Sequence, residues 1–282
     1  MVLESLISPL KAEKRPWELI LIGFIYSIVA FFISMQIFSQ LAGLVAVFLT
    51  VMASIPLMYA VIKFEEEKDL TDQKELSLLK EHGKALTAFF ALFIGIFLAF
   101  SVCYIFLPEQ TIETAFSLQI STIKNINSGG TGAAVYVDMF SRIFFNNLKV
   151  LLFCILFAFF YGAGALFILT WNASVIAVAV GAFVRTNISV YAERAGLFNA
   201  AAYFHIFSLG IARYMIHGTP EILAYFVGGL SGGIISIAII RHDFMSKKFE
   251  KVLLDAADLL VIAIVLLLAG SFLEVFVTPA LF

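Results

Sequence analysis

Long apolar runs recur along the chain, and each is about as long as a helix that crosses a bilayer. A hydrocarbon core about 30 Å thick needs about 20 apolar residues in a helix. The unbroken runs cover residues 17–38, 41–62, 85–107, 147–169, 197–216, 221–240 and 259–277. Lipid offers no hydrogen bonds to the backbone, so each run is expected to form a helix that pairs its own polar groups.

A shorter apolar stretch, residues 173–184, follows Asn172. Its twelve residues are too few to cross the hydrocarbon core. We therefore predict a re-entrant half-helix whose irregular end is buried in protein or faces water. The resulting fold class is all-α, a polytopic membrane helix bundle with seven transmembrane helices and one re-entrant half-helix. Eight full spans are the alternative.

Lysine and arginine are concentrated in three segments outside the apolar runs, residues 11–15, 63–84 and 241–251. Such segments lie preferentially on the cytoplasmic face. Seven spans with one re-entrant helix place all three there, with the N-terminus in the cytoplasm and the C-terminus outside the cell membrane. Eight spans would place residues 241–251 outside, which favours the first arrangement.

Composition excludes several classes of protein. Hydrophobic residues make up 62% of the chain and charged residues 13%, whereas a soluble domain carries about 25% charge. The net charge of −2 is not that of a protein that neutralises nucleic-acid phosphates. Cys103 and Cys154 both lie in apolar runs, so we expect neither a disulfide framework nor a zinc site. No metal or cofactor is expected.

A highly charged segment ends at about residue 84, and we place a boundary between two parts of the chain there. We interpret residues 1–84 as an N-terminal membrane unit of two spans and a charged cytoplasmic loop, and residues 85–282 as the membrane core. The longest polar loop, residues 108–146, should face outward. Within it, residues 111–126 have the apolar spacing of a helix that lies on the membrane surface.

The densest polar group near a predicted span is the sequence His217-Gly218-Thr219-Pro220-Glu221. Thr219 is suited to cap a helix and Pro220 to occupy its first position, which would leave Glu221 in the first turn. We expect His217 and Glu221 to lie close together at the outer membrane boundary. A helix-start motif is the simplest interpretation. A metal or proton site would need further ligands, from His205, Arg213 or Asn172.

Small residues are concentrated in the run 221–240. Residues 229–232 match the short G-x-S-G sequence of rhomboid-type intramembrane serine proteases, with Ser231 as the nucleophile. That chemistry needs a general base within hydrogen-bond reach, and His205 or His217 would have to serve. Close helix packing is the simpler role. The residues that would serve it are Gly228, Gly229, Gly232 and Gly233.

Two asparagines bracket the fourth predicted span, with Asn147 at its start and Asn172 just after its end. An unpaired amide in an apolar medium costs a few kcal/mol, so both must find partners. Asn172 is suited to cap the re-entrant helix. Glu274 lies near the outer end of the last span, where simple exposure is the preferred interpretation.

The second half of the chain resembles the stage II sporulation protein M family. The resemblance covers roughly residues 144–240 and includes Trp171-Asn172, Gly181 and an H-G-x-x-E sequence at 217–221. It implies an integral membrane protein that anchors cell-wall-degrading enzymes, without an active site of its own. The residues that it singles out are Asn147, Asn172, His217, Gly218 and Glu221.

These observations predict a non-catalytic membrane scaffold or anchor subunit that recruits extracytoplasmic enzymes of the cell envelope. The loop 108–146 and the turn 217–221 would face its partners. A transporter or channel and an intramembrane hydrolase are the two alternatives. The partners implied are the lipid bilayer, a membrane or extracytoplasmic protein and a second copy of the chain, and no nucleic acid is expected.

Overall fold

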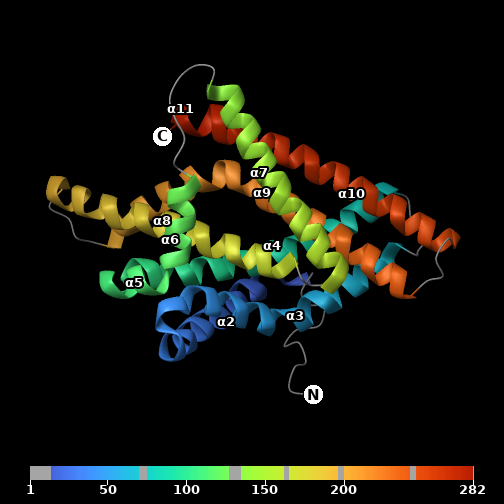
Figure 1. Cartoon of the computed structure of the whole chain (residues 1–282), viewed down its shortest axis with the longest axis horizontal. Coiled ribbons are helices and arrows are strands. Elements are labelled where there is room, and N and C mark those ends of the chain that lie inside the picture. The colour runs from blue at the N-terminus through green and yellow to red at the C-terminus, as the bar shows by residue number, and fades with distance from the viewer. Residues whose placement is uncertain are drawn as a thin grey trace.

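The computed structural model describes residues 14–69, 75–126, 135–161, 165–195, 200–241 and 246–281, and within these ranges the chain is helical with no strand (Figure 1). The longer helices are α2 (Pro16–Ile37), α3 (Ala42–Asp69), α4 (Glu75–Phe106), α7 (Val135–Tyr161), α8 (Ala165–Ala195), α9 (Ala200–Arg241) and α10 (Lys247–Phe272). The shorter elements are the 3-10 turn η1 (Ser39–Leu41), α5 (Glu109–Ala115), α6 (Ser117–Ile126), the π-helix η2 (Leu273–Val277) and α11 (Thr278–Leu281).

Seven helical segments within the described ranges are long and apolar enough to cross a membrane. They are Pro16–Ile37, Ser39–Phe64, Gly83–Phe106, Tyr136–Phe159, Ala165–Ile188, Ala202–Ile240 and Phe249–Leu281. The predicted fold class is confirmed at this level: the protein is an all-α, multi-pass membrane bundle. In Figure 1, the joined ends of α9 and α10 lie at the right of the bundle, whereas α5 and the C-terminal end of α8 lie at the left.

The predicted re-entrant half-helix is wrong. Helix α8 runs unbroken from Ala165 to Ala195 and includes all of residues 173–184. The apolar residues before Asn172 belong to this helix rather than to the preceding one, which gives α8 a spanning length. Asn172 does not break the helix, because its Nδ2 donates to the carbonyl O of Ile168 one turn earlier at 2.8 Å.

The two spans predicted at 197–216 and 221–240 are also wrong, because helix α9 continues through both as 42 residues. Residues 197–199 lie outside the described ranges. Pro220 is therefore inside a helix and not at its start. Proline lacks an N–H and its ring clashes with the carbonyl one turn earlier, which bends a helix without necessarily ending it. Figure 1 shows α9 changing direction near its middle.

Residues 111–126, predicted as one helix on the membrane surface, belong to two short helices, α5 and α6, that meet at Phe116. The membrane-surface position stays a prediction. The Phe116 ring is fully buried. It stacks on Phe31 of α2 with the ring centroids 5.1 Å apart, and it lies edge-on to Tyr104 of α4 at 5.5 Å. The aromatic anchor breaks the helix at this point and fixes α5 and α6 against the bundle.

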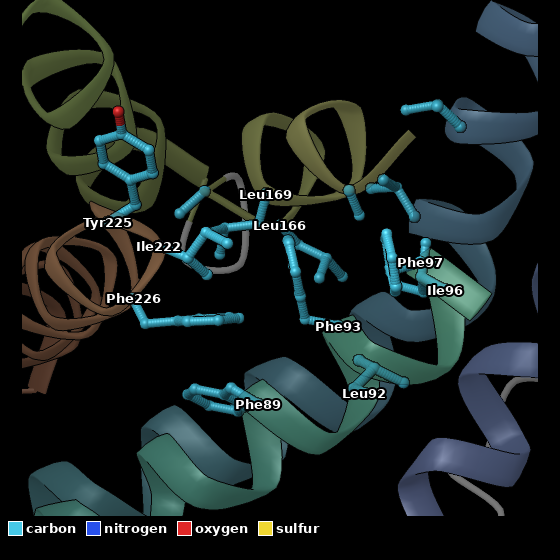
Figure 2. Packing of buried hydrophobic residues seen from close by; sticks show 14 of the residues in the cluster. Phe89, Leu92, Phe93, Ile96, Phe97, Leu166, Leu169, Ile222, Tyr225 and Phe226 are labelled. Carbon is cyan, nitrogen blue, oxygen red and sulfur yellow. The ribbon is translucent and has the colours of Figure 1, made fainter. Parts of the chain in front are cut away.

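The apolar core lies where α4, α8 and α9 meet. Figure 2 shows Phe89 and Phe93 of α4 near Phe226 of α9, with Leu166 and Leu169 of α8 above them. The Phe93 and Phe226 rings lie edge to face, with their centroids 6.0 Å apart. In lipid there is no hydrophobic driving force between helices. Van der Waals packing of this kind holds them together, and it is stronger the more closely the helices approach.

Glycines provide the closest helix crossings. A Cβ atom built at Gly23 of α2 would lie 2.5 Å from the carbonyl O of Leu92, and one at Gly95 of α4 would clash with the backbone of Ile20. The two helices therefore approach through a reciprocal glycine pair that the sequence interpretation missed.

The predicted packing glycines lie at two further interfaces of α9. A Cβ atom at Gly228 or Gly232 would collide with α7, at Leu151 and at Ile155 respectively, and one at Gly229 would lie 2.8 Å from Ala165 Cβ at the start of α8. Gly233 is buried on the same helix. Gly218 differs from these residues, because nothing lies within 4 Å of the position that its Cβ would occupy.

We expect Gly232→Ala to lower the free energy of unfolding by about 1–3 kcal/mol, the usual cost of overpacking. Its methyl group would lie 2.6 Å from the carbonyl O of Ile155, a backbone atom that cannot move aside. Gly218→Ala is the matched control and should be neutral or stabilising, because alanine is the better helix former. Thermal unfolding in detergent measures both variants, and equal effects would contradict the packing role of Gly232.

Candidate functional site

Polar side chains from three parts of the chain meet inside the bundle. Asn147 of α7 donates from its Nδ2 to Oε1 of Glu221 on α9, at 2.6 Å. Asn147 is 9% exposed, so the bond is largely withdrawn from competing water. A hydrogen bond to a carboxyl group in such surroundings fixes the two helices relative to each other.

His217 extends the contact to the C-terminal end of the chain. It lies one turn before Glu221 on α9, on the same face of the helix. Its Nδ1 is 3.1 Å from Oγ1 of Thr278, at the start of α11, so one of these atoms donates and the other accepts.

Glu274 completes the group, which we call the polar cluster: Asn147, His217, Glu221, Glu274 and Thr278. Glu274 lies in the π-helix η2 and interacts electrostatically with Glu221. Gly270 of α10 makes room for Glu221, because a Cβ atom there would be 2.6 Å from Glu221 Cγ. Glu274 is half-buried against α9 and not simply exposed, contrary to the sequence interpretation.

The structure brings together three of the five residues singled out by the sequence. Asn147, His217 and Glu221 belong to the polar cluster, whereas Asn172 bonds within its own helix. Gly218 is buried next to His217, but no other helix approaches it closely. Segment 217–221 is not the predicted turn, because it is a bent part of α9 packed against α7 and α10. Its partner-facing role stays a prediction.

The side chains of the polar cluster form hydrogen bonds that join helices. Within the described residues, no group of three histidine, cysteine, aspartate or glutamate side chains is arranged to hold a metal ion. The two side-chain hydrogen bonds of the cluster join different helical elements, α7 with α9 and α9 with α11. In an apolar environment each such bond satisfies polar groups that would otherwise be left unpaired at a cost in free energy.

Ser231, the candidate nucleophile, is engaged in another contact. Its Oγ donates to the carbonyl O of Ala256 on α10 at 2.9 Å, and the side chain is fully buried. His217 is fourteen positions earlier on α9, about 21 Å along a helix. Ser231 therefore joins α9 to α10 and has no base within reach on its own helix.

Two polar residues that the sequence interpretation did not single out also join helices. Nη1 of Arg185 on α8 donates to the carbonyl O of Leu107 at 2.9 Å and to that of Ile105 at 3.2 Å, which caps the C-terminal end of α4. Gln119 of α6 is fully buried and donates to Ser174 of α8 at 3.3 Å. In the sequence, Arg185 could have been recognised as a lone cation at the end of an apolar run. No feature of the sequence singles out Gln119.

Fold and polar cluster together define the class: a multi-pass helical membrane protein whose internal polar side chains bond one helix to the next. A comparison with protein-family models matches residues 88–279 to "Stage II sporulation protein M". This is more than half of the chain, so the protein belongs to the stage II sporulation protein M family. Comparisons with curated proteins and with solved structures give no significant match.

The family match is longer than the resemblance drawn from residues 144–240. It begins at residue 88, near the predicted division at 84, and extends to residue 279 through Glu274 and Thr278. All members of the polar cluster therefore lie within the matched region. Helix α4 runs across the predicted division without interruption, and the two-unit interpretation stays a prediction.

We expect Glu221→Leu to lower the free energy of unfolding by about 1–3 kcal/mol, because the Asn147 amide then loses its acceptor in an apolar surrounding. Glu221→Gln keeps an oxygen acceptor in the same place and should cost less than about 1 kcal/mol. Unfolding of the purified variants in detergent measures the difference. If the leucine variant is as stable as the glutamine variant, the bond is not a stabilising helix contact.

Proposed function

We propose that this protein is a non-catalytic membrane scaffold, or anchor, that holds a partner protein at the outer face of the membrane. The observation that carries the proposal is the hydrogen bond between Asn147 and Glu221. It engages the carboxyl group of Glu221, and it uses that group to join α7 to α9. Ser231 is engaged in the same way with α10.

The proposed orientation has the N-terminus in the cytoplasm and the C-terminus outside. Seven single crossings leave the positive segments 11–15, 63–84 and 241–251 on one side, which the positive-inside rule assigns to the cytoplasm. The same count leaves α5 and α6 on the outer side. Their exposed residues, among them Gln110 and Thr114, are the proposed surface for an envelope enzyme or another extracytoplasmic protein.

Pull-down of the tagged full-length chain from native membranes tests this proposal. We expect the native protein to enrich a reproducible partner and the double variant Gln110→Arg/Thr114→Arg to lose it, because two arginines change the charge and shape of α5. Glu250→Arg is the matched control at the opposite end of the bundle. It alters a residue of α10 that is also exposed and should leave the partner bound.

Two results would overturn the scaffold proposal. One is the absence of any protein that is reproducibly enriched over a mock purification. The other is a partner that both the α5 variant and the α10 control retain equally, which would remove the outer-face surface from the account.

A transporter or channel is the second candidate, and the pair of carboxyl groups inside the bundle favours it. Glu221 and Glu274 interact at the π-helix η2. Ionisable residues within a membrane and π-helical turns are both often found at functional sites. Flux of protons or monovalent cations into liposomes, lost in Glu274→Gln but retained in Glu250→Gln, would support transport over scaffolding.

A further inference from the structure

A cavity of about 640 Å³ lies apart from the polar cluster, between the end of α4, the short helices α5 and α6, and α8. Its volume is typical of ligand-binding sites. The charged and hydroxyl-bearing residues around it include Tyr104, Glu109, Glu113, Ser121 and Arg185. Ile112, Ile120 and Ala182 provide the apolar part of the lining.

The cavity lies at the level where two spans leave the bilayer. The apolar segment of α4 ends at Phe106 and that of α8 ends at Ile188, three residues after Arg185. Val102 and Phe106 are exposed on the last turns of α4, on the side of the helix away from Tyr104, which lines the cavity. Lipid head groups lie at the level where an apolar span ends, so the head group of a lipid beside the bundle lies at the level of Arg185.

The charges in the cavity have opposite signs. Glu109 and Glu113 are one turn apart on α5, both are exposed, and neither forms an ion pair with any residue that the structure describes. Nη1 of Arg185 is engaged by α4 carbonyls, while no described residue accepts from its other donors. Glu109, Glu113 and Arg185 all line the same cavity, with the side chain of Tyr104 also in its wall.

We propose that this cavity binds a phosphoethanolamine group, supplied by phosphatidylethanolamine in the outer leaflet. The ammonium group donates to the carboxylates of Glu109 and Glu113, and the phosphate accepts from the free donors of Arg185 and from the hydroxyl of Ser121. A guanidinium and a phosphate form a strong, charge-assisted pair. An ammonium with three N–H donors suits two carboxylates, whereas the quaternary ammonium of choline has no N–H to donate.

Lipid retention by the purified full-length chain tests the proposal. Dodecyl maltoside micelles are doped with equal amounts of dioleoyl phosphatidylethanolamine, phosphatidylcholine or phosphatidylglycerol, and native mass spectrometry counts the bound lipid. We expect about fivefold more phosphatidylethanolamine than phosphatidylcholine to be retained, the effect of a partly exposed ion pair. The double variant Glu109→Gln/Glu113→Gln should reduce this preference to parity.

Two further variants separate binding from folding. Asp138→Asn removes an exposed carboxylate that is paired with Arg142 on α7, and it should leave the lipid preference unchanged. Ser121→Leu narrows the cavity without changing its charge and should lower retention of phosphatidylethanolamine. A native chain that shows neither a preference between the lipids nor a response to soluble phosphoethanolamine would overturn the proposal. A lipid preference that the Glu109/Glu113 variant keeps would also overturn it.

Soluble phosphoethanolamine distinguishes the two sources of the group. If the lipid is the ligand, the soluble compound displaces bound phosphatidylethanolamine only when it is in large excess. If the soluble compound alone raises the melting temperature of the native chain and the lipid is not retained, the chemistry of the site stands and its ligand comes from solution. In either case the Glu109/Glu113 variant should not respond.

Discussion

The hydrogen bond between Asn147 and Glu221 is the contact on which this account of the membrane core depends. An amide and a carboxyl group inside a bundle cannot rely on water, and either one left alone would cost a few kcal/mol. Their mutual bond at 2.6 Å removes that cost only while α7 and α9 keep their relative position. Together with the His217–Thr278 contact, it ties the C-terminal end of the chain to the bent middle of α9.

The internal polar residues and the outer surface therefore have different roles. Inside the bundle, Ser231 and Gln119 follow the pattern of the polar cluster, since each bonds to a neighbouring helix. At one end of the bundle, α5 carries Glu109 and Glu113 beside a cavity and without an ion pair to any described residue. A bundle that is fixed internally and charged at one end is suited to present a binding surface.

The apolar runs predicted the helical membrane bundle because run length follows directly from bilayer thickness. The same runs gave the wrong helix ends at two positions. Asn172 and Pro220 are residues that commonly end a helix, but each lies inside one here. Asn172 bonds its own backbone, and Pro220 bends α9. The pairing of His217 with Glu221 followed from their spacing. Asn147, Glu274 and Thr278 are 53–74 residues away in sequence from their partners on α9. Helix packing brings them together, and local sequence spacing could not predict it.

A double-mutant cycle on Asn147 and Glu221 tests the central contact most directly. Unfolding free energies are measured in detergent for the native chain, Asn147→Leu, Glu221→Leu and the double variant. The account predicts a coupling energy of about 0.5–2 kcal/mol, with the double variant more stable than the sum of the single losses implies. Single losses that add without coupling would show that the two side chains do not hold α7 and α9 together.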